Sequence, residues 1–160
     1  MAEEFDNIRY VSVMYELYEN QSDLDFRFMH MKLLFNMNIK LIVLVEPKLM
    51  YQLETIVDEL NATNIQLISF PKENLETYNY IINLKNITMP ESDNMQKDTL
   101  KFHALMNSKT EILNIVCDKN KLNLIPEHIK YVIWIDLSLT KVLNDMDLAK
   151  FRLNYEIQKN

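Results

Sequence analysis

Short apolar runs, rich in β-branched and aromatic residues, recur along the chain and predict its strands. They are IRYVSVMYEL at 8–17, IKLIVLVEP at 39–47, IQLISFP at 65–71 and YVIWIDLSL at 131–139. Runs of this length and composition are typical of β-strands. The second run is almost continuously apolar and ends at a proline, which is the pattern of a parallel strand covered on both faces.

Between these runs, apolar residues recur at the spacing of amphipathic helices. The predicted inner face of the helix in 22–38 consists of Phe26, Met29, Leu33 and Leu34, and that of the helix in 48–62 consists of Leu49, Leu53, Ile56, Val57 and Leu60. Ser22 or Asp23 would cap the first of these helices. Further on, the pattern predicts a short helix over 73–84, a long helix from Asp93 or Asn94 to Asn120, and a terminal helix over 144–160.

Strands that alternate with helices predict a three-layer α/β fold with a mostly parallel, doubly wound sheet. Ligands of such sheets bind beyond the carboxyl ends of the strands, near the point where the strand order reverses. Asp136 is the one acid within the last apolar run and lies toward its carboxyl end. It therefore stands where a ligand is expected.

Composition narrows the class of protein. With 160 residues, 48% apolar and 25% charged, the chain is expected to form a single domain. The net charge of −6 disfavours a nucleic-acid partner, and no stretch approaches the roughly 20 apolar residues of a membrane helix. The lone Cys117 permits no internal disulfide, which agrees with a reducing compartment, so a cytoplasmic location is predicted. The apolar residues around Cys117 predict that it lies in the core. Abundant Asn, Ile and Lys suggest a viral or AT-rich genome.

The sequence contains no glycine. Walker A loops and the dinucleotide-binding fingerprint both need glycine where the backbone turns tightly against phosphate, so both are excluded. A bound diphosphate would have to be neutralised by a metal held on carboxylates, by lysines, or by helix N-termini.

The pattern around Asp136 leaves its role open. As a structural residue, this acid would cap the turn that follows the strand. As a functional residue, it would bind a hard divalent ion, since Mg²⁺ and Mn²⁺ take carboxylate oxygens together with substrate phosphates.

The segments MNSKTEIL at 106–113 and YVIWIDLSL at 131–139 resemble a part of the bacterial HtrL/YibB family, in which a Ser-Lys pair on a helix precedes a strand ending in Trp-x-Asp-x-Gly. That family is similar to GT-A glycosyltransferases. The resemblance implies that residues 1–160 form the Rossmann-like, nucleotide-binding half of a GT-A fold without the acceptor-binding half. It also implies that Asp136 binds Mn²⁺ or Mg²⁺ and that Lys109 lies near the diphosphate of a nucleotide sugar such as a UDP-sugar. Ser138 stands in place of the family's glycine, so there is no Asp-x-Asp pair.

Further residues are candidates for nucleotide binding, and each has a structural alternative. Tyr15 would stack on the base or pack in the core. Glu46, which closes the second apolar run, would accept a hydrogen bond from the base or face water. Lys97 and Lys101 would share one helix face and present their charge either to the diphosphate or to solvent.

The leading hypothesis is a domain that binds a nucleoside diphosphate sugar for sugar transfer, with the metal stabilising the leaving group. The sequence identifies no catalytic residue. The alternative is a non-catalytic interaction module that keeps the fold and forms a homodimer through a sheet edge or a Met-rich helix face. A flavodoxin-like receiver or flavin domain also fits the alternation, but a receiver needs an acid cluster for which only Asp136 and Glu46 are candidates.

Overall fold

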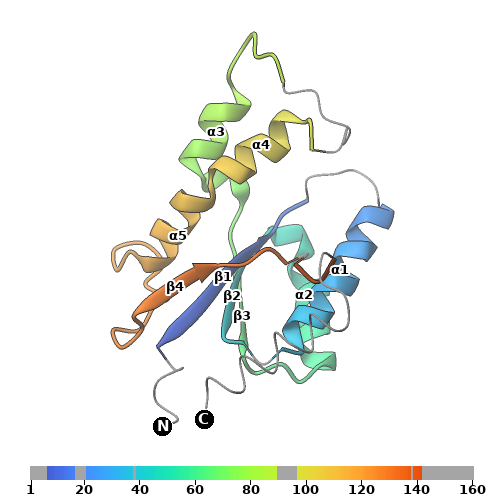
Figure 1. Ribbon diagram of the computed structural model, residues 1–160, viewed down its shortest axis with the longest axis vertical. Coiled ribbons are helices and arrows are strands. Elements are labelled where there is room, and N and C mark those ends of the chain that lie inside the picture. Colours follow the sequence, from blue (N-terminus) through green and yellow to red (C-terminus); the bar gives the residue numbers. More distant parts are fainter. Residues whose placement is uncertain (1–6, 17–20, 38, 90–96, 138, 142–160) are drawn as a thin grey trace.

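A computed structural model describes residues 7–16, 21–37, 39–89, 97–137 and 139–141. Its sheet contains β1 (Ile8–Met14), β2 (Leu41–Val45), β3 (Ile65–Ser69) and β4 (Tyr131–Trp134), in the spatial order β3-β2-β1-β4. Each neighbouring pair is parallel (Figure 1), which confirms the predicted parallel sheet. The chain runs outward from β1 to β3 and then returns to the other side of β1, so the strand order reverses between β1 and β4.

The register brings the carboxyl ends of the strands together. Met14 of β1 pairs with Val45 of β2, which pairs with Ser69 of β3, so these strands end at the same level. On the other side, Val11 pairs with Trp134, and the next amide, Ile135 N–H, donates to the Val11 carbonyl at 3.0 Å. Asp136 is therefore the second residue after β4 and lies at the carboxyl ends of the strands, the carboxyl edge of the sheet, where ligands of parallel sheets bind.

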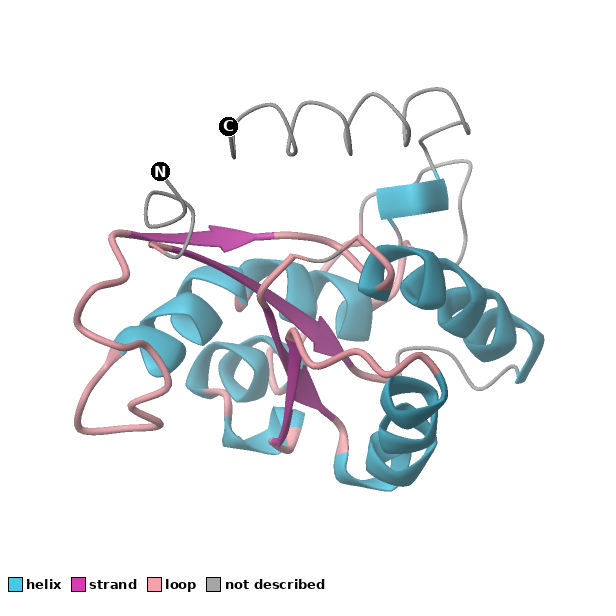
Figure 2. Ribbon diagram, turned by 90° about the horizontal axis from the view of Figure 1, so that it is seen from below, coloured by secondary structure: helices cyan, strands magenta, loops and turns pink. Residues whose placement is uncertain are grey.

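Helices cover both faces of the sheet, as the alternating pattern predicts. On one face lie α1 (Gln21–Phe35), the 3-10 turn η1 (Pro47–Leu49), α2 (Met50–Glu59) and the 3-10 turn η3 (Leu139–Lys141). On the other face lie the 3-10 turn η2 (Lys72–Asn74), α3 (Glu76–Ile82), α4 (Leu100–Asn107) and α5 (Lys109–Cys117). Figure 1 shows these two groups on opposite sides of the strands, and Figure 2 shows the twist of the sheet between them. The fold is a three-layer, doubly wound α/β arrangement.

Strand β2 lies in the middle of both cores. All of its residues are buried, and they alternate between the two faces. Leu41, Val43 and Val45 belong to the core that includes buried residues of α1 and α2, whereas Ile42 and Leu44 belong to the core that includes buried residues of α3, α4 and α5. This confirms the prediction of a strand covered on both faces, because only such a strand needs apolar residues at every position.

The predicted inner face of α1 is confirmed at Leu34 and wrong at its other three residues. Phe26, Met29 and Leu33 are 41%, 51% and 44% exposed. The residues that pack on the sheet are Leu24, Met31, Leu34 and Phe35. The helix carries apolar residues on nearly all of its sides, so their spacing does not show which side faces the sheet.

The long helix predicted up to Asn120 is two helices. Helix α4 begins at Leu100, where the Thr99 hydroxyl accepts a hydrogen bond from the Phe102 N–H at 3.2 Å, and α5 begins after Ser108. The Ser108 side chain is fully buried and donates to the Ala104 carbonyl at 2.8 Å. Serine hydroxyls that donate in this way to the carbonyl four residues earlier, in the preceding turn, often bend helices. The proposed starts at Asp93 or Asn94, and the terminal helix over 144–160, lie outside the described residues.

Asparagine takes the backbone conformations that glycine usually supplies. Asn61, Asn86 and Asn123 have φ values of 49°, 58° and 48°. At the end of α2, the Asn61 N–H bonds the Asp58 carbonyl and the Ala62 N–H bonds the Val57 carbonyl, both at 3.0 Å. This is the Schellman pattern with asparagine at the left-handed position. Helix α2 therefore ends in the usual geometry without glycine.

The expectation that Cys117 lies in the core is wrong. Cys117, which was expected in the core, is exposed at the end of α5. The apolar residues around it, Ile115 and Val116, fill the core instead.

Among the helices that the structure describes, none combines the length and hydropathy needed to span a bilayer.

The packing of α1 predicts different costs for two neighbouring leucines. Leu34→Ala should lower the free energy of unfolding by about 3 kcal/mol, because Leu34 is fully buried and its removal leaves a cavity. Leu33→Ala should cost less than about 1 kcal/mol. Urea denaturation of both variants measures the difference. Equal costs would mean that α1 packs through a different face.

Candidate functional site

Asp136, Lys109 and Trp134 form a contact group at the reversal point of the sheet. The Asp136 Oδ1 atom is 3.1 Å from Lys109 Nζ and accepts a hydrogen bond from Trp134 Nε1 at 3.0 Å. Lys109 Nζ also lies 5.0 Å from the centre of the Trp134 ring, within the range of a cation–π contact. The lysine side chain is 29% exposed and that of Asp136 57%, so the group lies at the surface.

The chain path explains why these residues meet. Helix α5 leads through a loop to β4, so its C-terminal end lies at the amino end of β4 and its first turn lies at the carboxyl end (Figure 1). The bend at Ser108 makes Lys109 the first residue of α5. A carboxylate at this position also interacts favourably with the positive end of the α5 dipole. Lys109 and Asp136 therefore approach each other although they are 27 positions apart in the sequence.

Tyr15 and Glu46 lie at the same carboxyl ends of the strands, where they directly follow β1 and β2. Tyr15 is fully buried among the residues that face α3, α4 and α5, so a base cannot stack on its ring in this arrangement. Its Oη atom has no hydrogen-bond partner within the described part of the chain. Burial, followed by the charges of Glu46, Glu73 and Glu111, raises the pKa of Tyr15 well above its ordinary value. Its hydroxyl therefore stays protonated at neutral pH.

Glu46 forms a partly buried ion pair with a residue that the sequence did not single out. Its Oε2 atom is 2.7 Å from Lys72 Nζ, and the two side chains are 8% and 15% exposed. Burial lowers the pKa of Lys72, but the hydrogen bond and the charge of Glu46 outweigh it, so the net shift is upward. Lys72 follows β3 after Phe70 and Pro71, much as Glu46 follows β2. That position at a strand end was the signal that could have indicated it.

Glu111 and Arg27 hold the edge in place through backbone groups. The Glu111 carboxylate, in the first turn of α5, accepts from the N–H groups of Glu76 and Thr77 at 2.7 and 2.9 Å. It thereby supplies the carboxylate partner for the start of α3. Arg27 of α1 donates to the Tyr15 carbonyl at 2.6 Å. Neither residue was predicted, because their partners are backbone atoms distant in the sequence.

The two lysines expected to share a helix face do not share one. Lys97 lies in a turn before α4, while Lys101 lies in the first turn of α4, so the expected helical spacing does not apply. Both side chains are exposed. Their predicted contact with a diphosphate stays a prediction.

The acids at this edge do not form a metal site as they stand. Asp136 is paired with Lys109, Glu46 and Glu73 with Lys72, and Glu16 with Lys48, while Glu111 binds the N–H groups of α3. In the part of the chain that the structure describes, no group of three or more His, Cys, Asp or Glu residues could hold a metal ion. A divalent ion at Asp136 would have to share this carboxylate with the Lys109 ammonium, and it stays a prediction.

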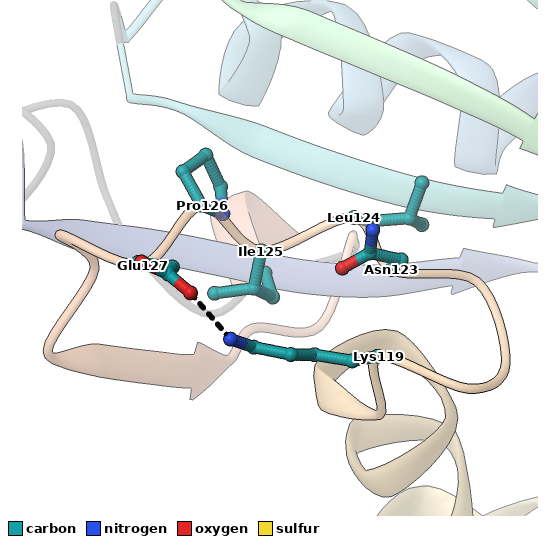
Figure 3. Close-up of a pocket in the computed structure, with 6 residues that line it drawn as sticks. All are labelled: Lys119, Asn123, Leu124, Ile125, Pro126 and Glu127. Atoms are coloured by element: carbon teal, nitrogen blue, oxygen red, sulfur yellow. Dashed lines mark hydrogen bonds and ion pairs between the residues drawn. The ribbon is translucent and has the colours of Figure 1, made fainter.

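A separate depression lies at the opposite edge of the sheet from Asp136, beside the loop that leads into the amino end of β4. It has a volume of about 410 Å³ and is formed by the loop between α5 and β4 (Figure 3). Its lining residues are Lys119, Asn123, Leu124, Ile125, Pro126 and Glu127. Lys119 and Glu127 pair across it at 2.6 Å, but their side chains are 66% and 85% exposed, so this pair contributes little stability. The pair is a useful control for the buried and partly buried pairs of the carboxyl edge.

Comparison with known proteins identifies no relative: no family model, no curated protein and no solved structure matches the chain.

The Glu46–Lys72 pair predicts a marked asymmetry in stability. Lys72→Met should lower the free energy of unfolding by about 2 to 3 kcal/mol, because Glu46 then remains largely buried without its cation. The double variant Glu46→Gln/Lys72→Met should be more stable than Lys72→Met. The control Lys119→Met breaks an exposed pair and should cost no more than about 0.5 kcal/mol. If Lys72→Met were as mild as Lys119→Met in urea denaturation, the pair would carry no structural weight.

Stability should fall at alkaline pH. The pKa values of Tyr15 and Lys72 are raised in the folded chain from ordinary values of 10.0 and 10.5. Their contribution is complete below these ordinary values and is lost as the pH rises toward the folded values, because the unfolded state releases its protons first. Urea denaturation at about pH 8 and about pH 11 measures the loss.

Two tyrosine variants measure how much of the alkaline loss of stability comes from Tyr15. Tyr15→Phe should reduce the alkaline loss of stability, since the buried phenol no longer titrates. Tyr80→Phe changes a side chain that is 69% exposed and should leave the loss unchanged. An equal loss in wild type and Tyr15→Phe would contradict the burial of this hydroxyl.

Proposed function

We propose that this chain binds a nucleoside diphosphate sugar at the carboxyl edge of its sheet, and that it is a GT-A-like domain related to the HtrL/YibB family. The observation that carries the proposal is the contact group of Asp136, Lys109 and Trp134 next to the reversal point between β1 and β4. This is the position at which parallel α/β sheets bind their ligands. The same residues carry the resemblance in the sequence.

The described residues suggest how each part of the ligand is bound. Lys109 is oriented by Asp136 and Trp134 and still partly exposed, so its remaining N–H groups can donate to a phosphate oxygen. Glu46 lies on the same edge, and its carboxylate would accept from the base only if its bond to Lys72 is shared. No residue of the described edge is assigned as a catalytic base. The transfer of the sugar to an acceptor rests on the resemblance alone.

The remaining expectations belong to the same proposal. The resemblance adds Mn²⁺ or Mg²⁺ at Asp136, and the single cysteine favours a cytoplasmic location. A UDP-sugar is the proposed partner, whereas the net charge of −6 disfavours nucleic acid.

A non-catalytic interaction module is the second candidate. It is favoured by the exposed stripe of Phe26, Met29 and Leu33 on α1, since exposed apolar stripes often mark contacts between proteins. It is also favoured by the acids of the carboxyl edge, which are already paired. This candidate predicts self-association as a homodimer and no affinity for a nucleotide.

Calorimetric titration of UDP into the purified chain in the presence of Mn²⁺ tests the proposed function. We expect saturable binding that Asp136→Ala weakens at least about tenfold, because Lys109 loses the group that orients it. The matched control Glu127→Ala removes an acid from an exposed lysine pair at the opposite edge and should not change the affinity. Absence of binding in the wild type, together with a dimer in solution, would favour the interaction module.

A further inference from the structure

We infer that the carboxyl edge binds the diphosphate without a metal ion, with the Lys109 ammonium supplying the positive charge and Asp136 acting as a positioning residue for that lysine. This inference rests on the proposed function and changes the role of its central acid. It departs from the metal that the resemblance implies, and the departure comes from the contacts of the edge.

The first argument concerns the Asp136 carboxylate. Its Oδ1 atom is already bound by the Lys109 ammonium and the Trp134 indole N–H. A divalent ion at this oxygen would lie within a few ångströms of a positive charge, and the two would repel each other. Magnesium and manganese sites avoid this arrangement because they gather carboxylates rather than ammonium groups.

The second argument concerns the other acids of the edge. Glu16 and Glu46 each have a lysine partner, and Glu111 binds backbone N–H groups. Recruiting Glu46 to a metal would strand Lys72, and recruiting Glu111 would expose the unpaired start of α3. A second carboxylate could therefore reach a metal only at the expense of contacts that hold the fold.

The third argument concerns Lys109. An ammonium has three N–H donors, and the Asp136 oxygen uses one of them. The ring of Trp134 lies beside the ammonium and limits its rotamers, so little side-chain entropy remains to be lost on binding. A phosphate oxygen can therefore bind Lys109 while the Asp136 contact stays in place.

Calorimetric titration of UDP into the purified chain, once in EDTA and once in Mn²⁺, tests this inference. The chain contains a single tryptophan, so the emission of Trp134 reports binding beside Lys109 independently. We expect dissociation constants that agree within about twofold in the two buffers and a change in Trp134 emission in both. Pyrophosphate should produce the same change in emission, because the diphosphate is the group that Lys109 binds.

Variants of Lys109 separate its charge from its structural contacts. In EDTA, Lys109→Met should weaken UDP binding at least about tenfold, while Lys109→Arg should keep it within about threefold, since the positive charge remains. The matched control Lys119→Met removes one positive charge from the opposite edge and should have no effect. Circular dichroism of each variant establishes that the fold is intact.

The outcomes distinguish this inference from the proposed function. Binding in Mn²⁺ that disappears in EDTA would overturn the metal-free site and leave the nucleotide-binding function standing. Binding in EDTA that is equally strong in Lys109→Met would also overturn it. No binding in either buffer would overturn both proposals.

Discussion

With no glycine among its 160 residues, the chain has to make every turn and every ligand contact with residues that carry a Cβ atom. In the turns, asparagine solves the problem: Asn61, Asn86 and Asn123 adopt positive φ, and Asn61 ends α2 in a Schellman pattern. For a ligand the consequence is greater. A glycine-rich loop that wraps phosphate in backbone N–H groups is excluded, so positive charge at the carboxyl edge would have to come from lysines, from helix N-termini or from a metal held on carboxylates. Lys48, Lys72 and Lys109 are described lysines that the fold places there.

The first turn of α5 supplies side chains that hold two neighbouring parts of the carboxyl edge. Lys109 binds the acid that follows β4, and Glu111 binds the first amides of α3. The buried Ser108 ends α4 and so fixes where this turn begins. One turn of helix thus connects the last strand of the sheet with the helix that follows β3. A ligand that binds Lys109 would act on the same turn that organises its surroundings.

The sequence predicts the parts of this structure that depend on local patterns. The strands and the double cover of β2 follow from short apolar runs, because period and composition are properties of neighbouring residues. The inner face of α1 could not be predicted, since apolar residues surround the helix and only the position of the sheet decides which of them are buried. The break at Ser108 depends on one hydroxyl bond that many mid-helix serines do not make.

Only the parts of the candidate site that depend on local patterns could be predicted from the sequence. The position of Asp136 at a strand end follows from the alternation of elements, and the resemblance points to Lys109. Their contact, and that between Glu46 and Lys72, joins residues 27 and 26 positions apart, so neither can be seen in a local pattern. The first of these contacts bears on the proposed function, because Asp136, which the resemblance assigns to a metal, is already paired with an ammonium group. The sequence alone shows the acid but not its partner.

Nuclear magnetic resonance of the ¹⁵N-labelled chain during a UDP titration tests most directly whether the ligand site lies at the reversal point of the sheet. Trp134 gives a single indole N–H signal, and that N–H donates to Asp136. The account predicts shifts of this signal and of the amides of Lys109, Glu111 and Leu137, while the amides of the 119–127 loop stay unchanged. Shifts confined to that loop, or an unmoved indole signal at saturation, would contradict it.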